Sequence, residues 1–168
     1  VGCNLRCKFR FSDKPVWKPQ KAGKFYTPQQ VFDGLAKSAR KHGHTIISAS
    51  ASEGTIGRDH LMELLHLVEK SEFIYVLETN GMILGNDSEY AHALSKYSRL
   101  HVRVSIKGDS PEQYHELTGA RPDSYELPYK ALGHLIDAGV SCNACLMASF
   151  SDDEGIKRVK QRLIRVHP

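Results

Sequence analysis

The sequence predicts an α/β fold in which parallel strands are joined by helices. Strand-like and helical segments alternate along the whole chain, and several helices are preceded by residues that favour a helix start. A chain of 168 residues with 40% hydrophobic and 25% charged residues also has the length and composition of one folded globular domain. Alternating elements require right-handed crossovers between parallel strands, which leaves a barrel and a doubly wound sheet as candidate architectures.

The first predicted helix carries the clearest local signals. Thr27 is suited to an N-cap, Pro28 to the first helical position, and Gln30 to the far half of a capping box. Gly43 is suited to end this helix. The elements predicted after it are a strand at 45–50, a helix marked by Leu61, Leu64, Leu65 and Val68, a strand at 73–79, a helix at 88–97 capped by Asp87, a strand at 101–107, a short helix after Ser110, a helix at 124–138 ended by Gly139, a strand at 140–150 and a basic helix at 156–166. Because segment 73–79 is apolar almost throughout, we expect helices on both of its faces.

The strand at 101–107 helps to choose between the two architectures. Its apolar and polar residues occupy opposite faces, with Val102, Val104 and Ile106 on one and Arg103, Ser105 and Lys107 on the other. A sheet covered by helices on both sides, or a barrel filled with branched apolar residues, does not accommodate such a polar face. An open barrel with a wet or ligand-filled lumen does, and an edge strand with one solvated face is the other possibility.

The first ten residues contain a cysteine motif. Two thiolates separated by three residues, with a third two residues later, can bind three irons of a 4Fe-4S cluster and leave the fourth iron open to another ligand. Cys3 and Cys7 have this spacing, but the third position is Arg10. An arginine side chain has no free lone pair and cannot bind iron.

This segment resembles the CxxxCxxC loop of the radical S-adenosylmethionine (radical SAM) superfamily, with Phe9 as the aromatic residue before the third position. Three further segments match that family in order and spacing. Segment 50–57 resembles its GGEP segment, segment 78–81 (Glu-Thr-Asn-Gly) resembles the TNG segment of activase-like members, and segment 104–107 resembles the strand whose Ser or Asp and Lys face the cofactor. The resemblance covers essentially the whole chain.

The resemblance implies a partial (β/α) barrel with parallel strands, formed by a single core domain at 1–168 whose first strand is largely missing and whose C-terminal end is incomplete. It also implies a 4Fe-4S cluster and S-adenosylmethionine, which the family cleaves reductively to a 5′-deoxyadenosyl radical. The implied cluster ligands are Cys3 and Cys7, and the implied cofactor-binding residues are Phe9, Ala51, Ser52, Glu53, Thr79, Asn80, Ser105 and Lys107. Within that set, Glu53 would take the amino group of the cofactor, Ser105 the ribose hydroxyls and Lys107 the carboxylate.

Two departures from the family pattern affect the same cofactor site. Arg10 removes one cluster ligand, and Ala51 and Ser52 replace glycines that allow close approach of the backbone to the ligand. Gly54 replaces a proline that stiffens the turn presenting Glu53. We therefore expect radical chemistry to be impaired or lost, and the alternative is a non-catalytic module that binds a small molecule or a protein on the same scaffold.

Two other sites are weaker candidates. Cys142 and Cys145 could join Cys3 and Cys7 in a zinc site, but an offset of three in a strand puts their thiols on opposite faces, so small core residues are the favoured interpretation. The basic helix at 156–166 could contact nucleic acid, but acidic residues at its start favour a barrel helix with a solvated outer face.

The partners expected from the sequence are a small-molecule cofactor and a protein or small-molecule substrate. The net charge of 23 − 19 = +4 favours anionic partners only weakly. Apolar runs of at most five residues exclude a membrane span, and four cysteines without a signal-like segment indicate the cytoplasm.

Overall fold

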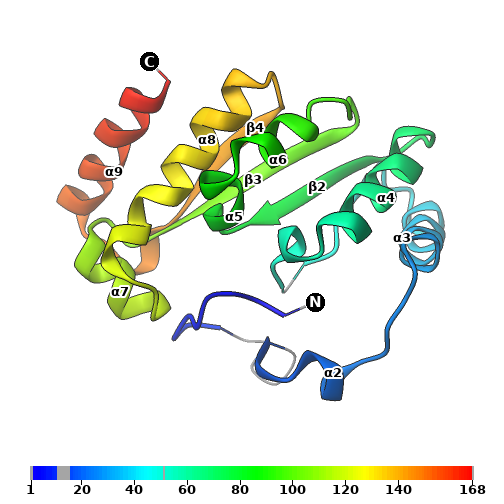
Figure 1. Ribbon diagram of the computed structural model, residues 1–168, viewed down its shortest axis with the longest axis horizontal. Helices are drawn as coiled ribbons and strands as arrows, with labels where there is room; N and C mark the ends of the chain where they lie inside the picture. The colour runs from blue at the N-terminus through cyan, green and yellow to red at the C-terminus, as the bar shows by residue number, and fades with distance from the viewer. Residues whose placement is uncertain (1, 11–15, 51, 168) are drawn as a thin grey trace.

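The computed structural model describes residues 2–10, 16–50 and 52–167, which form a parallel four-stranded sheet with helices packed against it (Figure 1). The strands are β1 (Ile46–Ile47), β2 (Ile74–Thr79), β3 (Leu100–Lys107) and β4 (Cys142–Met147), and their order in the sheet is their order in the chain. Every neighbouring pair is parallel. The α/β prediction is confirmed, and within the described residues the strands do not close into a cylinder.

Apart from α2, which lies beside the N-terminal segment, the helices lie together on one side of this sheet, where α8 packs against β3, β4 and α5 (Figure 1). Their bounds are α2 Pro19–Ala22, α3 Pro28–His42, α4 Arg58–Glu69, α5 Met82–Asn86, α6 Ser88–Ala93, α7 Pro111–Thr118, α8 Leu127–Asp137 and α9 Asp153–Val166, with short 3-10 turns at Gly54–Ile56, Pro122–Glu126 and Ala148–Phe150. Among the helices of the described ranges, none has the length and apolar character needed to cross a membrane.

The capping signals in the sequence are confirmed at α3. The Thr27 hydroxyl accepts a hydrogen bond from the backbone N–H of Gln30, at 3.2 Å, and the Gln30 side chain accepts one from the N–H of Thr27, at 2.9 Å. Gly43 ends the helix in the left-handed conformation, with φ at 69°. The side chains of Asp87 and Ser110 cap α6 and α7 in the predicted way.

Only one face of the sheet is covered by helices. In β3 the apolar residues are fully buried while the polar residues between them are partly exposed, as predicted. The same alternation runs along β2, where Ile74 is 42% exposed. The expectation that helices cover both faces of β2 is therefore wrong, because its outer face belongs to the open side of the sheet. This arrangement agrees with a partial barrel that has a wet lumen.

The N-terminal segment crosses the carboxyl ends of the strands (Figure 1). Backbone N–H groups of Arg6 and Lys8 donate to carbonyls at the end of α7, at 2.8 and 2.9 Å, and the N–H of Glu53 donates to the carbonyl of Gly2 at 3.0 Å. The Leu5 side chain between these bonds is 1% exposed. Residues 2–10 are thus held at both ends over the mouth of the sheet.

Candidate functional site

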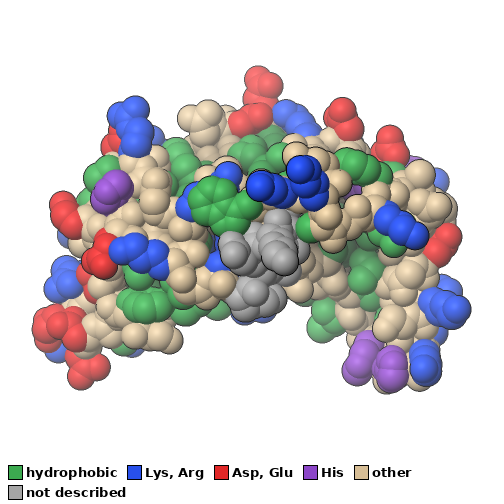
Figure 2. All heavy atoms as spheres, turned by 90° about the horizontal axis from the view of Figure 1, so that it is seen from below, with side chains coloured by type: hydrophobic (Ala, Val, Ile, Leu, Met, Phe, Trp, Pro, Cys, Tyr) green, Lys and Arg blue, Asp and Glu red, His purple; other side chains and the backbone are tan. Residues whose placement is uncertain are grey.

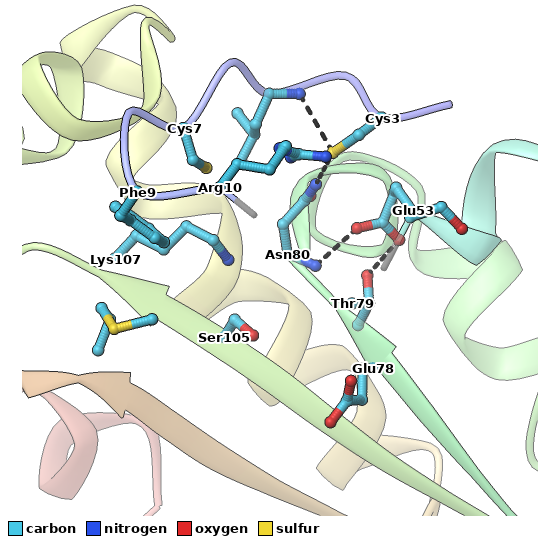
Figure 3. A pocket seen from close by; sticks show the side chains of 13 residues that line it. Cys3, Cys7, Phe9, Arg10, Glu53, Glu78, Thr79, Asn80, Ser105 and Lys107 are labelled. Atoms are coloured by element: carbon cyan, nitrogen blue, oxygen red, sulfur yellow. Dashed lines mark hydrogen bonds between the residues drawn. The ribbon is translucent and has the colours of Figure 1, made fainter. Parts of the chain in front are cut away.

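A cavity of about 310 Å³ lies between the N-terminal segment and the carboxyl ends of β2 and β3 (Figure 3). Parallel α/β sheets commonly bind ligands at this end, where the loops after several strands meet. Its lining consists of Cys3, Leu5, Cys7, Phe9, Arg10, Ser52, Glu53, Glu78, Thr79, Asn80, Ser105, Lys107 and Met147. All the residues named as site candidates from the sequence are brought together here except Ala51, which lies outside the described residues.

Glu53 ties two loops of the cavity wall together. Its Oε1 accepts hydrogen bonds from the hydroxyls of Thr55 and Thr79, at 2.6 and 2.7 Å, and a longer one from the N–H of Thr55, at 3.4 Å. Its Oε2 accepts from the N–H of Asn80 at 2.7 Å. Oε1 thus has its acceptor positions filled by protein donors and Oε2 has one such donor, in a residue that is only 1% exposed. In this structure Glu53 holds the loop after β1 against the end of β2.

Asn80 extends this connection to the cysteine loop. Its amide nitrogen donates to the Asn4 side chain at 2.7 Å and approaches the Cys3 sulfur at 3.8 Å, while its oxygen accepts from the N–H of Met82 at 3.0 Å. Gly81, next in the chain, has φ at 75°, and a Cβ there would lie 2.9 Å from the α8 backbone. The Thr-Asn-Gly sequence therefore turns the chain sharply and directs the Asn80 amide at the cysteine loop.

Arg10 extends between Cys3 and Cys7 (Figure 3). Burial alone would lower the pKa of the Arg10 guanidinium, but the nearby sulfurs of Cys3 and, to a smaller extent, Cys7 outweigh this effect and raise it. Its Nε is buried without a hydrogen-bond partner among the described residues. The third position of the cysteine motif is thus occupied by a cation that lies near both sulfurs.

The β3 residues Ser105 and Lys107 form the floor of the cavity. Burial lowers the pKa of the Lys107 ammonium, against the opposing influence of the thiols and the carboxylate nearby. Deeper along the same face, Arg103 donates to Glu78 at 3.0 Å. Glu78 and Met147 line the cavity although they were not predicted as site residues. Met147 pairs in register with Lys107, and the sequence contained no signal for that register.

The second cysteine pair does not converge on the first. Cys142 packs on the helix-covered side of β4, against the core. Cys145 pairs in register with Ser105 and accepts a hydrogen bond from Arg103 at 3.4 Å on the open side. The predicted opposite orientation of the two thiols is confirmed, but the expectation that both are core residues is wrong for Cys145, because β4 is covered on only one face.

The donors in this cavity do not fit a 4Fe-4S cluster held by three cysteines. Two thiols are present, the third position carries a guanidinium with no lone pair to offer, and the described residues contain no group of three His, Cys, Asp or Glu side chains placed to hold a metal ion. The lining is better suited to a nucleoside-sized molecule. It combines the apolar side chains of Leu5, Phe9 and Met147 with a few polar groups, as small-molecule sites usually do.

The family model of the radical SAM superfamily matches residues 1–162, and the chain therefore belongs to that superfamily. Among curated proteins, it is 29% identical over 105 residues to a 7-carboxy-7-deazaguanine synthase of Methanothermobacter thermautotrophicus, covering 62% of this chain and 40% of that protein. It is 26% identical over 156 residues to a probable GTP 3',8-cyclase of Methanosarcina acetivorans, covering 90% of this chain and 45% of that protein. The chain thus spans less than half the length of these two relatives.

Solved structures show the same fold. The structure of Streptococcus suis SuiB bound to the precursor peptide SuiA matches with a TM-score of 0.78 and 18% identity, covering 98% of this chain and 35% of that one. SuiB bound to S-adenosylmethionine matches with a TM-score of 0.75 and 18% identity, covering 98% and 34%. TYW1 with a lysine-pyruvate adduct matches with a TM-score of 0.62 and 18% identity, covering 98% and 58%. The partial-barrel fold predicted from the sequence is confirmed.

Proposed function

We propose that residues 1–168 form one core domain that binds S-adenosylmethionine or a close analogue in the cavity, and that this domain does not support reductive cleavage of the ligand. The observation that carries this proposal is the placement of Arg10 between Cys3 and Cys7. In the family, the cluster supplies the electron for cleavage when it is bound. A site with two thiols and a fixed cation has one anionic ligand too few to hold that cluster firmly.

The ligand side of the cavity supports binding. The 310 Å³ volume lies within the range of small-molecule sites. Lys107 offers an ammonium group to a carboxylate, Ser105 offers a hydroxyl to a ribose, and Phe9 and Met147 offer apolar surface to a base. Because the Glu53 carboxylate is already bonded to Thr55, Thr79 and Asn80, its proposed contribution is to hold the wall that these groups share.

The family's radical chemistry is the second candidate function. It is favoured by the position of Cys3 and Cys7, whose thiols both line the cavity that contains Lys107. A third ligand from outside this chain would complete the donor set. In that case the open face of the sheet would receive the substrate, and the similar structure of SuiB bound to the precursor peptide SuiA suggests a peptide as one kind of ligand.

Anaerobic reconstitution with iron and sulfide separates the two candidates. We expect low iron content, no electron paramagnetic resonance signal of a reduced cluster, and ligand binding that calorimetry still detects. A stoichiometric cluster whose signal changes when S-adenosylmethionine is added would support the radical enzyme. Absence of both cluster and ligand binding would contradict both candidates.

A further inference from the structure

The acidic side chains that line the cavity are paired with protein groups, whereas its basic side chains have no carboxylate partner among the described residues. The two carboxylates that line it are committed to protein partners, since Glu53 accepts four hydrogen bonds and Glu78 pairs with Arg103. The two cations, Arg10 and Lys107, both reach into the space between the N-terminal segment and the sheet (Figure 3). Among the described residues, no carboxylate forms an ion pair with either of them at 4.0 Å or less. The charge available to a ligand is therefore positive.

The two cations also influence each other. Lys107 is partly buried, and the positive charge of Arg10 is one of the effects that lower its pKa. A guanidinium does not lose its proton in proteins, so Arg10 stays charged at every pH at which the protein is folded. Figure 2 shows Lys and Arg side chains close to the middle of the face that carries the N-terminal segment, and side chains of both charges toward its rim.

A positively charged cavity treats the two forms of an adenosyl amino acid differently. Both S-adenosylmethionine and S-adenosylhomocysteine carry an adenosine, an amino group and a carboxylate. They differ by one methyl group and by the positive charge of the sulfonium. A carboxylate is attracted by Lys107 and Arg10, whereas a sulfonium in the same space is repelled, and this repulsion grows as the cavity excludes water.

We propose that Arg10 reverses the charge selectivity of this cavity, so that it takes the neutral thioether, of the S-adenosylhomocysteine type, in preference to the sulfonium. This inference rests on the proposed function, because it assumes that an adenosyl ligand occupies the cavity. Lys107 and Arg10 together hold the carboxylate end of the ligand. The thioether sulfur then lies beside Arg10 without a charge to oppose it.

Calorimetric titration of the metal-free chain with each of the two ligands tests the inference. We expect S-adenosylhomocysteine to bind at least about tenfold more tightly than S-adenosylmethionine, which is the effect of one like-charge contact in a partly shielded site. Arg10→Gln should reduce this ratio severalfold, with Lys107 leaving a smaller preference, and Arg10→Lys, which keeps the charge, should preserve it. Lys8→Gln is the matched control, since it removes one positive charge from the same loop at an exposed side chain that pairs with Glu116.

The possible failures can be told apart. Equal or tighter binding of S-adenosylmethionine, with a ratio that Arg10→Gln leaves unchanged, would overturn the inference and leave the proposed function standing. A drop in the ratio for Lys8→Gln as large as that for Arg10→Gln would also overturn it, because the effect would then come from net charge. If neither ligand bound to the unsubstituted chain, the proposed function and the inference would both be wrong. Circular dichroism of each variant confirms that it folds.

Discussion

Glu53 illustrates how a single buried residue can shape this site. Its carboxylate joins the loop after β1 to the end of β2, and through Asn80 the same connection reaches the cysteine loop. Its two oxygens accept hydrogen bonds from four protein donors, and the residue is only 1% exposed. Such a group contributes most when every partner is present, because each donor would otherwise be left buried and unsatisfied.

Glu53→Gln is predicted to lower the free energy of unfolding by about 1–3 kcal/mol. The amide NH2 group of glutamine would replace one acceptor oxygen, and as a donor it cannot bond the donors from Thr55 or Asn80 that face it. Urea unfolding followed by circular dichroism measures the change. Glu63→Gln, at an exposed position of α4, is the control and should change stability by less than about 0.5 kcal/mol. Similar losses in both variants would show that the buried connection is not what stabilises the loop.

The sequence predicted which residues line this site, but not the contacts that their side chains make. The motifs in the sequence correctly predicted that Cys3, Lys107 and Asn80 share one cavity, because the ends of parallel strands meet at one edge of the sheet. The spacing could not show that the Glu53 carboxylate is already occupied, since its partners depend on how two loops approach in three dimensions. It also could not show where the Arg10 guanidinium points.

Among the helices, α5 packs closely against α8 at a glycine. At Gly85 in α5 an added Cβ would overlap the backbone carbonyl of Leu127 at the start of α8. Backbone atoms cannot move aside as a flexible side chain can. The absence of a side chain at Gly85 therefore allows α5 and the start of α8 to approach each other closely.

Gly85→Ala is predicted to destabilise the chain by about 1–3 kcal/mol through overpacking, despite the better helix propensity of alanine. Gly133→Ala in α8 is the matched substitution, because its Cβ would meet nothing within 4 Å. That variant should gain about 0.5–1 kcal/mol from helix propensity alone. Thermal unfolding of both variants provides the measurement, and equal shifts of the same sign would disprove the role assigned to the α5–α8 contact.

Glu69 connects the end of α4 to the start of β3, and we expect its contribution to folding stability to depend on pH. Hydrogen bonds from the Ser98 hydroxyl, at 2.6 Å, and from the Arg99 N–H, at 3.0 Å, hold the pKa of the Glu69 carboxyl below its usual value of 4.5. A carboxyl whose pKa is lowered by folding stabilises the native state above its unfolded pKa, and this stabilisation is lost as the pH falls through the folded value.

Glu69→Gln should therefore lower the free energy of unfolding at pH 7, by less than about 1 kcal/mol because the group is partly exposed, and should have a smaller effect at about pH 3. Urea unfolding at the two pH values measures the difference. Ser98→Ala removes the donor of the shorter bond, and the stability of this variant should therefore depend less on pH over the same range. An effect of Glu69→Gln that is the same at both pH values would contradict this explanation.

The elements differ in how well the sequence predicted them. Caps such as Thr27 and Ser110 were predictable because their hydrogen bonds are made within three residues. The helix α5 was missed, because it has only five residues and its start at Gly81 depends on contact with α8. The strand predicted at 140–150 ends at Met147, where pairing with β3 ends. Local signals were thus sufficient only where the stabilising contacts were also local.

In the molecule as a whole, the fold is that of the superfamily, whereas the cysteine motif that binds its cluster is incomplete. The chain belongs to the radical SAM superfamily and has its parallel sheet, with the mouth of the sheet closed by residues 2–10. The mouth retains two of the three cysteines. Introducing a thiol at position 10 therefore tests whether the site has the geometry to hold a cluster.

Arg10→Cys is predicted to raise the iron and sulfide bound per chain after anaerobic reconstitution, because it supplies the third thiolate and removes a cation from between the other two. The measurement is iron content together with the absorbance of a 4Fe-4S cluster, which needs no substrate or activity. Lys8→Cys is the matched control. It adds the same thiol to the same loop, but at an exposed side chain that pairs with Glu116 on the outside of the cavity. If iron content rises equally in both variants, the added thiol binds iron without regard to position. If it rises in neither, Cys3 and Cys7 are not aligned as cluster ligands, and the resemblance of this loop to the family motif does not extend to its chemistry.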